Sequence, residues 1–104
     1  MIVHKLVRQM KDGSFSPLFI NKKMRIPLGE WLEAEDHPTS GFARRKGWHC
    51  TVDPHAPHLK LNPKNKTPRV WLVAEVEDYE KYKRPESQGG QWVLAQRIKF
   101  LRKK

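Results

Sequence analysis

The densest group of residues able to do chemistry lies between residues 44 and 58. Three of the five histidines and the single cysteine fall within residues 49–58, directly after a basic triplet. Imidazole and thiol groups transfer protons or bind metals, and the cations hold anions. We therefore expect any functional site to include this window. From this window we expect six binding residues, which are Arg44, Arg45, Lys46, Trp48, His49 and His58.

A metal site in this window lacks the usual ligand pattern. Cys50, Asp53, His55 and His58 have tolerable spacing, whereas His49 would point to the opposite face of a strand from Cys50. No second ligand pair of the CxxC or HxxxH kind accompanies them. We predict no metal and no cofactor, and interpret these histidines as loop residues that cap turns.

Cys50 is also a candidate nucleophile, since neighbouring histidines or the basic triplet would favour its thiolate. A lone cysteine on a short strand is more typical of a small buried hydrophobic residue. We assign no catalytic residue, and whether the chain is an enzyme stays open.

A second group occupies residues 81–92, where cations and aromatic residues precede a Gly-Gly pair. Arg84 and backbone amides would hold a phosphate there, with Tyr82 or Trp92 stacked on a base. The alternative is a polar connection between two strands, because Gly-Gly alone is no phosphate-loop motif. We include Lys83, Arg84 and Glu86 among the expected binding residues.

The charge balance favours a polyanionic partner. The 104 residues carry 21 Lys and Arg against 11 Asp and Glu, a formal net charge of +10. Such a surface attracts nucleic acid, acidic protein or acidic lipid headgroups. The single cysteine excludes an intrachain disulfide framework, which is typical of a reducing cytoplasm. With neither a signal-like apolar segment nor an apolar run of about 18 residues, we expect a cytoplasmic protein without a membrane partner.

The elements that must position these residues are short. The apolar residues of 2–10 also suit a helical face, but a turn at 12–14 and an extended segment over 15–20 follow them. We therefore predict a strand over 2–10. Residues 26–35 have a helical pattern, with Leu28, Trp31 and Leu32 on one side and acids near the start. Further expected elements are a strand over 48–52, a loop over 53–68, a strand over 69–77, a loop over 79–90 and a strand over 91–102.

In the last two strands, Val70, Leu72, Ala74 and Val76 should share one face, as should Trp92, Leu94, Ile98 and Phe100. If these strands pair, Glu75 and Glu77 would meet Arg97 and Lys99. The expected fold class is α+β. We expect one small β-dominated domain over residues 1–104, with a mixed or antiparallel sheet, one short helix and a basic C-terminal tail from about 102.

The order of several short motifs resembles an uncharacterised family of small phage and prophage proteins, which also occur as a module of larger phage polypeptides. The resemblance covers residues ~3–102 and implies a setting, the cytoplasm of a bacterial host, without a mechanism. The motifs are Pro17-Leu18-Phe19, Gly29-Glu30-Trp31-Leu32-Glu33-Ala34-Glu35, Gly47-Trp48-His49-Cys50, Ala56-Pro57-His58, Arg69-Val70-Trp71, Glu75-Val76-Glu77, Arg84-Pro85-Glu86, Gly89-Gly90-Gln91-Trp92 and Arg97-Ile98-Lys99.

A looser likeness concerns the ADP-ribosyltransferase-like domains, through a Gly-aromatic-His strand followed by a Val- and Glu-rich strand. In that likeness His49 would hold the nicotinamide ribose, and Glu77 or Glu86 would activate the acceptor. The leading expectation is a non-catalytic, basic phage-type accessory protein that binds nucleic acid or an acidic host protein. The alternative is a nucleotide-handling or nucleotide-sequestering protein with its pocket around His49.

Overall fold

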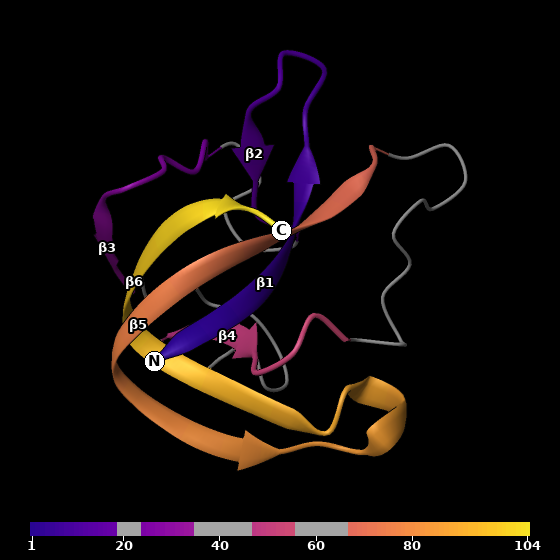
Figure 1. Ribbon diagram of the computed structural model, residues 1–104, viewed down its shortest axis with the longest axis vertical. Coiled ribbons are helices and arrows are strands. Elements are labelled where there is room, and N and C mark those ends of the chain that lie inside the picture. The colour runs from indigo at the N-terminus through magenta and orange to yellow at the C-terminus, as the bar shows by residue number, and fades with distance from the viewer. Residues whose placement is uncertain (19–23, 35–46, 56–66) are drawn as a thin grey trace.

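Where the structure describes the chain, its regular elements are nearly all strands (Figure 1). The computed structural model describes residues 1–18, 24–34, 47–55 and 67–104. All pairings between the named strands are antiparallel. This confirms a small, β-dominated fold. The elements are β1 (Ile2–Gln9), β2 (Phe15–Ser16), β3 (Trp31–Glu33), β4 (Trp48–Thr51), β5 (Arg69–Lys83), the 3-10 turn η2 (Glu86–Gln88) and β6 (Gln91–Lys103).

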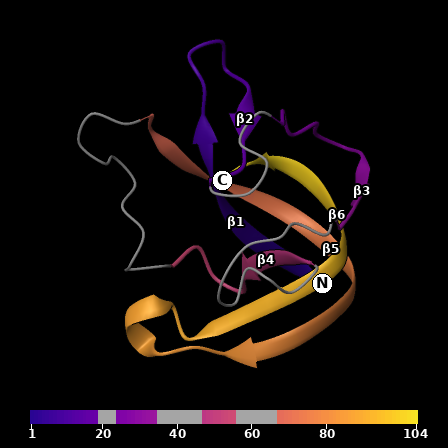
Figure 2. The ribbon, with the colours of Figure 1, turned by 180° about the vertical axis from the view of Figure 1, so that it is seen from behind.

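Four of the strands close into a ring of pairings. β5 pairs with β1 on one side and with β6 on the other, while β4 joins β6 back to β1. The β5–β6 ladder is long and curves through the molecule (Figures 1 and 2). In the described residues the β1–β4 pairing consists of the His4–Thr51 rung. The ring is therefore closed by its weakest ladder.

The hydrophobic core lies inside this ring. Side chains from β1, β4, β5 and β6 meet there, and Phe100, Leu72 and Ile98 are its largest fully buried members. The inward-facing residues of β1 and β5 follow the alternation that a strand imposes. The core cluster comprises Val3, Val7, Ile26, Cys50, Leu72, Ala74, Val76, Val93, Ala95, Ile98 and Phe100.

At Asp78, the alternation of core-facing and outward-facing side chains along the β5–β6 pair changes phase. This residue has φ +50°, a left-handed conformation that aspartate tolerates better than most residues. Val93 and Ala95 belong to the core together with Ile98 and Phe100, although the two pairs differ in strand parity. The prediction that Trp92 and Leu94 share one face with Ile98 and Phe100 is therefore wrong, because the alternation shifts phase between residues 95 and 98.

The helix expected over 26–35 is not present in its described part, residues 26–34. Trp31, Leu32 and Glu33 instead form the edge strand β3, in register with Lys99, Ile98 and Arg97 of β6. The helical pattern was misleading because pairing with a distant strand satisfies the backbone here. The amide of Gly29 bonds to the carbonyl of Phe100 (2.7 Å), and that of Ala34 to the carbonyl of Gln96 (2.7 Å).

The loop expected over 79–90 is shorter than predicted. β5 continues to Lys83 in register with β6, so only residues 84–90 connect the two strands. The predicted strands at the N-terminus, at 48–52 and at 91–102 are confirmed by β1, β2, β4 and β6. The expected extended segment over 15–20 is seen as strand only at Phe15–Ser16. Residues 19–20, and residues 56–66 of the expected 53–68 loop, lie outside the described residues.

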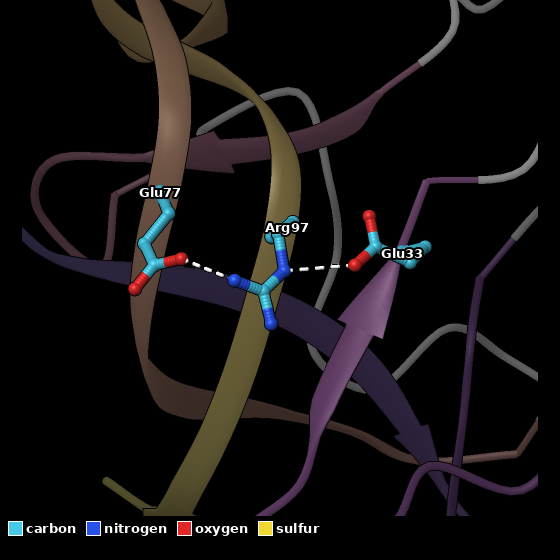
Figure 3. Close-up of polar contacts among 3 residues, drawn as sticks. All are labelled: Glu33, Glu77 and Arg97. Carbon is cyan, nitrogen blue, oxygen red and sulfur yellow. Dashed lines mark hydrogen bonds and ion pairs between the residues drawn. The ribbon is translucent and has the colours of Figure 1, made fainter.

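The predicted meeting of acids and cations across β5 and β6 is confirmed. Glu75 is in register with Lys99, and Glu77 with Arg97. The guanidinium of Arg97 also reaches Glu33 on the other side, with Nε 2.8 Å from Oε1, so one side chain ties β3, β5 and β6 together (Figure 3). Among the described residues, no helix has the length and hydrophobicity required to cross a membrane.

Candidate nucleic-acid interface

The structure places five of the expected binding residues. Trp48 and His49 lie on β4, Lys83 ends β5, Arg84 follows it, and Glu86 begins η2. The other four, Arg44, Arg45, Lys46 and His58, lie outside the described residues. The candidate site therefore rests on β4 and on the connection between β5 and β6.

His49 contacts the end of β5 through Tyr82. Its Nδ1 lies 3.3 Å from the hydroxyl oxygen of Tyr82. On the sheet, His49 is in register with Leu94, and Tyr82 is in register with Trp92, the next residue of β6 on the same face. The two groups of candidate residues in the sequence, within 44–58 and 81–92, are thus neighbours in space.

Arg84 is held over an aromatic ring. Its guanidinium carbon lies 4.7 Å from the ring centroid of Trp92, a distance typical of cation–π contacts. Tyr82 packs on the same ring, with centroids 6.5 Å apart and planes tilted by 31°. Trp92 itself is only 6% exposed, so its ring forms a buried surface on which Arg84 and Tyr82 pack. We name His49, Tyr82, Arg84 and Trp92 the hairpin site.

The backbone of the connection is fixed by hydrogen bonds. The indole Nε1 of Trp92 donates to the carbonyl of Gln88 (2.6 Å), and the amide of Arg84 donates to the carbonyl of Gly90 (2.7 Å). Gly89 adopts φ +98° to end η2, a conformation that favours glycine. A Cβ at Gly89 would lie 2.5 Å from the carbonyl oxygen of His55, so the end of the β4 segment rests against this turn.

Trp48 does not share the face of His49. Its ring packs edge-on against Phe100, with centroids 5.8 Å apart and planes at 82°, beside the core cluster. This follows from the alternation along β4, which sends Trp48 and Cys50 inward and His49 outward. Of the adjacent pair expected to line the site, His49 alone reaches the hairpin site.

Lys5 supports His49 from inside the ring and was not singled out by the sequence. Its ammonium donates to the backbone carbonyl of His49 (2.8 Å), bridging the gap where β1 and β4 separate after the His4–Thr51 rung. Burial lowers the pKa of Lys5, while nearby Cys50 opposes this shift. The only sequence signal was a cation at an inward position of an otherwise apolar strand.

Cys50 is buried in the core and is a free cysteine. Burial raises the pKa of its thiol to about 11, with Lys5 acting in the opposite direction. The thiol is therefore protonated at neutral pH, a state in which it is a poor nucleophile. Within the part of the chain that the structure describes, no three His, Cys, Asp or Glu side chains are arranged to hold a metal ion.

The acids considered for the nucleotide alternative have other neighbours in the described residues. Glu77 is bound to Arg97, with 2.5 Å between Oε2 and Nη1 (Figure 3). The carboxylate of Glu86 lies beside Gly90, where a Cβ would be 3.3 Å from its Oε1. The described contacts of His49 bring in Tyr82 and Lys5, which are a phenol and an amine.

Comparisons with protein-family models, with curated proteins and with solved structures found no match for this chain.

Proposed function

We propose that this chain is a small, basic, non-catalytic accessory protein that binds nucleic acid through the hairpin site. The setting suggested by the motif resemblance is a phage or prophage, and the location is the bacterial cytoplasm. The observation that carries the proposal is the cluster in which Arg84 stacks on Trp92 beside Tyr82 and His49.

This cluster combines the two contacts that single-stranded nucleic acid requires. A positive groove or patch tracks the phosphates, and an aromatic surface stacks on bases. Arg84 supplies a guanidinium for the phosphate on the face of Tyr82. Lys81 and Lys83 are exposed near the end of β5 and add positive charge from the opposite face of the strand. Tyr82 is half-buried and keeps part of its side chain accessible. An acidic protein would use the cations but would gain less from the aromatic surface, so nucleic acid is the favoured polyanion.

The test is the binding of a labelled single-stranded oligonucleotide, followed by fluorescence anisotropy at about 50 mM and 200 mM salt. We expect affinity to fall steeply with salt. Arg84→Gln should weaken binding several-fold at the lower salt, and Tyr82→Ala should weaken it about tenfold through lost stacking. The matched controls are Tyr82→Phe, which keeps the ring, and Arg25→Gln, which removes an exposed cation outside the hairpin site.

Absence of binding at the lower salt would reject nucleic acid and direct the search to an acidic host protein. Binding of a mononucleotide that survives moderate salt and is lost in His49→Ala would instead support the nucleotide-handling alternative. Equal losses in Arg84→Gln and Arg25→Gln would show that net charge, and not the hairpin site, attracts the oligonucleotide.

A further inference from the structure

The second half of β5 has one edge that no described strand covers. On one side, residues 79–83 pair with β6. On the other side, β1 pairs with β5 only over residues 69–75, after which the amide of Val76 reaches the carbonyl of Met1 (3.1 Å). Beyond Val76 this edge forms the lower border of the ribbon in both views (Figures 1 and 2). We name the uncovered side of residues 79–83 the free edge.

The free edge is exposed to solvent. Every residue from Glu77 to Lys81 is exposed, and so is Lys83. Tyr79 is 40% exposed, which makes it one of the few large hydrophobic side chains at the surface of the described residues. An exposed strand edge presents unpaired backbone groups and is a template for a further strand.

The backbone groups of three residues point toward the free edge. The amide of Arg84 donates to the carbonyl of Gly90 (2.7 Å), so the backbone of Arg84 faces β6. Along an antiparallel strand, successive residues direct these groups to opposite sides. Every second residue before Arg84 therefore also faces β6. The outward N–H and C=O groups belong to the residues between them, Tyr79, Lys81 and Lys83.

The charges of this segment complement a reversed copy of the same segment. Its acids, Asp78 and Glu80, come first, and its cations, Lys81 and Lys83, come last. In an antiparallel pair of identical strands, the acidic start of one strand lies beside the basic end of the other. The segment has no net charge although the whole chain carries +10, so charge repulsion between two copies is small along this edge.

We propose that the free edge binds a second copy of this chain, with the β5 strands of the two copies paired antiparallel about a two-fold axis. The axis runs perpendicular to the sheet, because opposite residues of an antiparallel pair point to the same face. The sheet then continues from one copy into the other. This inference goes beyond the proposed function, since the pairing requires no nucleic acid.

The outward backbone groups limit the register of this pairing. Only residues whose groups face outward exchange both hydrogen bonds across the axis. With Lys81 opposite Lys81 of the second copy, all of residues 79–83 have an opposite residue within the same segment, and any other allowed register leaves two of them outside. Tyr79 then lies opposite Lys83, and Glu80 opposite Tyr82. These rungs allow a cation–π contact and a hydrogen bond from the phenol to the carboxylate.

Lys81 is the unfavourable position in this arrangement. At the axis its ammonium lies opposite the same group of the second copy, and like charges directly opposite in a ladder are destabilising. Lysine on an edge strand also limits uncontrolled strand association. We therefore expect a weak, reversible dimer with a Kd between about 10 μM and 1 mM, in keeping with so short a ladder.

The two-fold axis also relates the hairpin sites of the two copies. Because it is perpendicular to the sheet, Tyr82 of each copy lies on the same face of the continuous sheet. A dimer would thus present both hairpin sites on one face. The dimer itself is nevertheless tested without an oligonucleotide.

The first test is sedimentation equilibrium of the purified chain from about 10 μM to 1 mM, in about 150 mM salt. We expect a monomer–dimer equilibrium. Lys81→Gln should strengthen the dimer several-fold, because it removes the like-charge rung at the axis. Lys83→Gln is the matched control. It removes an exposed lysine from the same strand, but this lysine faces Tyr79, so the dimer should be unchanged or weaker.

Lys81→Glu tests the register. In a mixture with the native sequence, only the heterodimer has opposite charges at the axis, whereas both homodimers have like charges there. With one of the two chains isotopically labelled, native mass spectrometry should find the heterodimer enriched about three- to tenfold over the statistical share. Lys83→Glu mixed in the same way should give no such enrichment. Melting temperatures close to that of the native sequence check that each variant is folded.

The outcomes separate this proposal from the proposed function. A monomer over the whole concentration range would overturn the dimer, and so would equal gains in Lys81→Gln and Lys83→Gln, since lower net charge alone would then explain them. A dimer without heterodimer enrichment for Lys81→Glu would also overturn it. A dimer that shows the expected pattern but binds no oligonucleotide would support the free edge and overturn the hairpin site.

Discussion

Gly89 and His55 are in close contact although they belong to different connections of the chain. A Cβ at Gly89 would lie 2.5 Å from the carbonyl oxygen of His55, and Gly89 has φ +98°. Gly13 has a similar φ of +87°, but a Cβ there would meet nothing within 4 Å. Alanine substitution at Gly13 therefore measures the free-energy cost of the backbone conformation alone. Substitution at Gly89 adds the cost of the contact with His55.

We expect Gly13→Ala to lower the free energy of unfolding by about 1 kcal/mol, the usual cost of a side chain in the left-handed region. Gly89→Ala should cost more, about 2–4 kcal/mol, because a backbone oxygen must also move. Urea unfolding of both variants checks this. Equal costs would show that His55 does not rest against the turn.

Arg97 is expected to contribute to stability through several exposed contacts. It pairs with Glu77 and Glu33, and its guanidinium carbon lies 5.0 Å from the ring centroid of Trp31. Exposed ion pairs are each worth well under about 1 kcal/mol, and a cation–π contact adds a similar amount. Arg97→Gln should therefore lower the free energy of unfolding by about 1–2 kcal/mol.

Lys99→Gln is the matched control for Arg97→Gln. Lys99 also lies over the ring of Trp31, 5.1 Å from its centroid. It therefore shares the aromatic contact but is not part of the Glu33–Arg97–Glu77 bridge. The loss in Arg97→Gln should be the larger at low salt, and high salt should reduce the difference. Equal losses at all salt concentrations would contradict a contribution from the ion pairs.

The buried thiol of Cys50 should make stability fall at alkaline pH. Burial raises its pKa from 9.0 to about 11, so between these values the folded state holds more protons than the unfolded state. The free energy of unfolding therefore decreases as pH rises through this range, by roughly 2–3 kcal/mol in full. Cys50→Ala should show a smaller decrease in denaturant titrations between about pH 8 and 11. Identical pH profiles would contradict it.

Lys5 should have the opposite pH dependence. Burial lowers the pKa of its ammonium in the folded state below the ordinary value of 10.5. At a pH between the folded pKa and 10.5, the unfolded state therefore holds more protons than the folded state. The stability of the native sequence relative to Lys5→Met should therefore increase as pH rises toward 10.5. Lys81→Met removes an exposed lysine and should show no such trend. A constant difference between the native sequence and Lys5→Met would place the ammonium in water.

The sequence predicted the strands whose apolar residues alternate, and it predicted the Glu77–Arg97 pair. β4 and the first half of β5 have the period-2 pattern that burial on one face imposes, and β6 has it in two parts of opposite phase. In β1 the apolar residues Ile2, Val3, Leu6 and Val7 also suit a helical face, and the turn that follows favoured the strand. The sequence-based prediction was wrong at β3, because Leu28, Trp31 and Leu32 match one face of a helix equally well. The deciding contact there is the pairing with β6, more than 60 residues away in the chain.

The second half of β5 was missed for a different reason. Tyr79, Glu80, Lys81 and Lys83 are exposed, so no burial pattern marks them as a strand. The face change at Asp78 removes the continuity with the apolar half as well. Within the site, the sequence indicated both His49 and the Tyr82–Trp92 segment. Their contact, and the support of His49 by Lys5, depend on the β4–β6 register, which no local pattern encodes.

The order of strands in the ring has a consequence for synthesis on the ribosome. β1 emerges first, yet its long partner is β5, and β5 pairs with β6, the last described strand to appear. The apolar side of β1 therefore stays uncovered while most of the chain is made. Contacts between such distant segments form slowly, because a long loop must close before they are gained. The nascent chain thus has an extended period in which an exposed apolar strand depends on its neighbouring cations, Lys5 and Arg8, for protection against self-association.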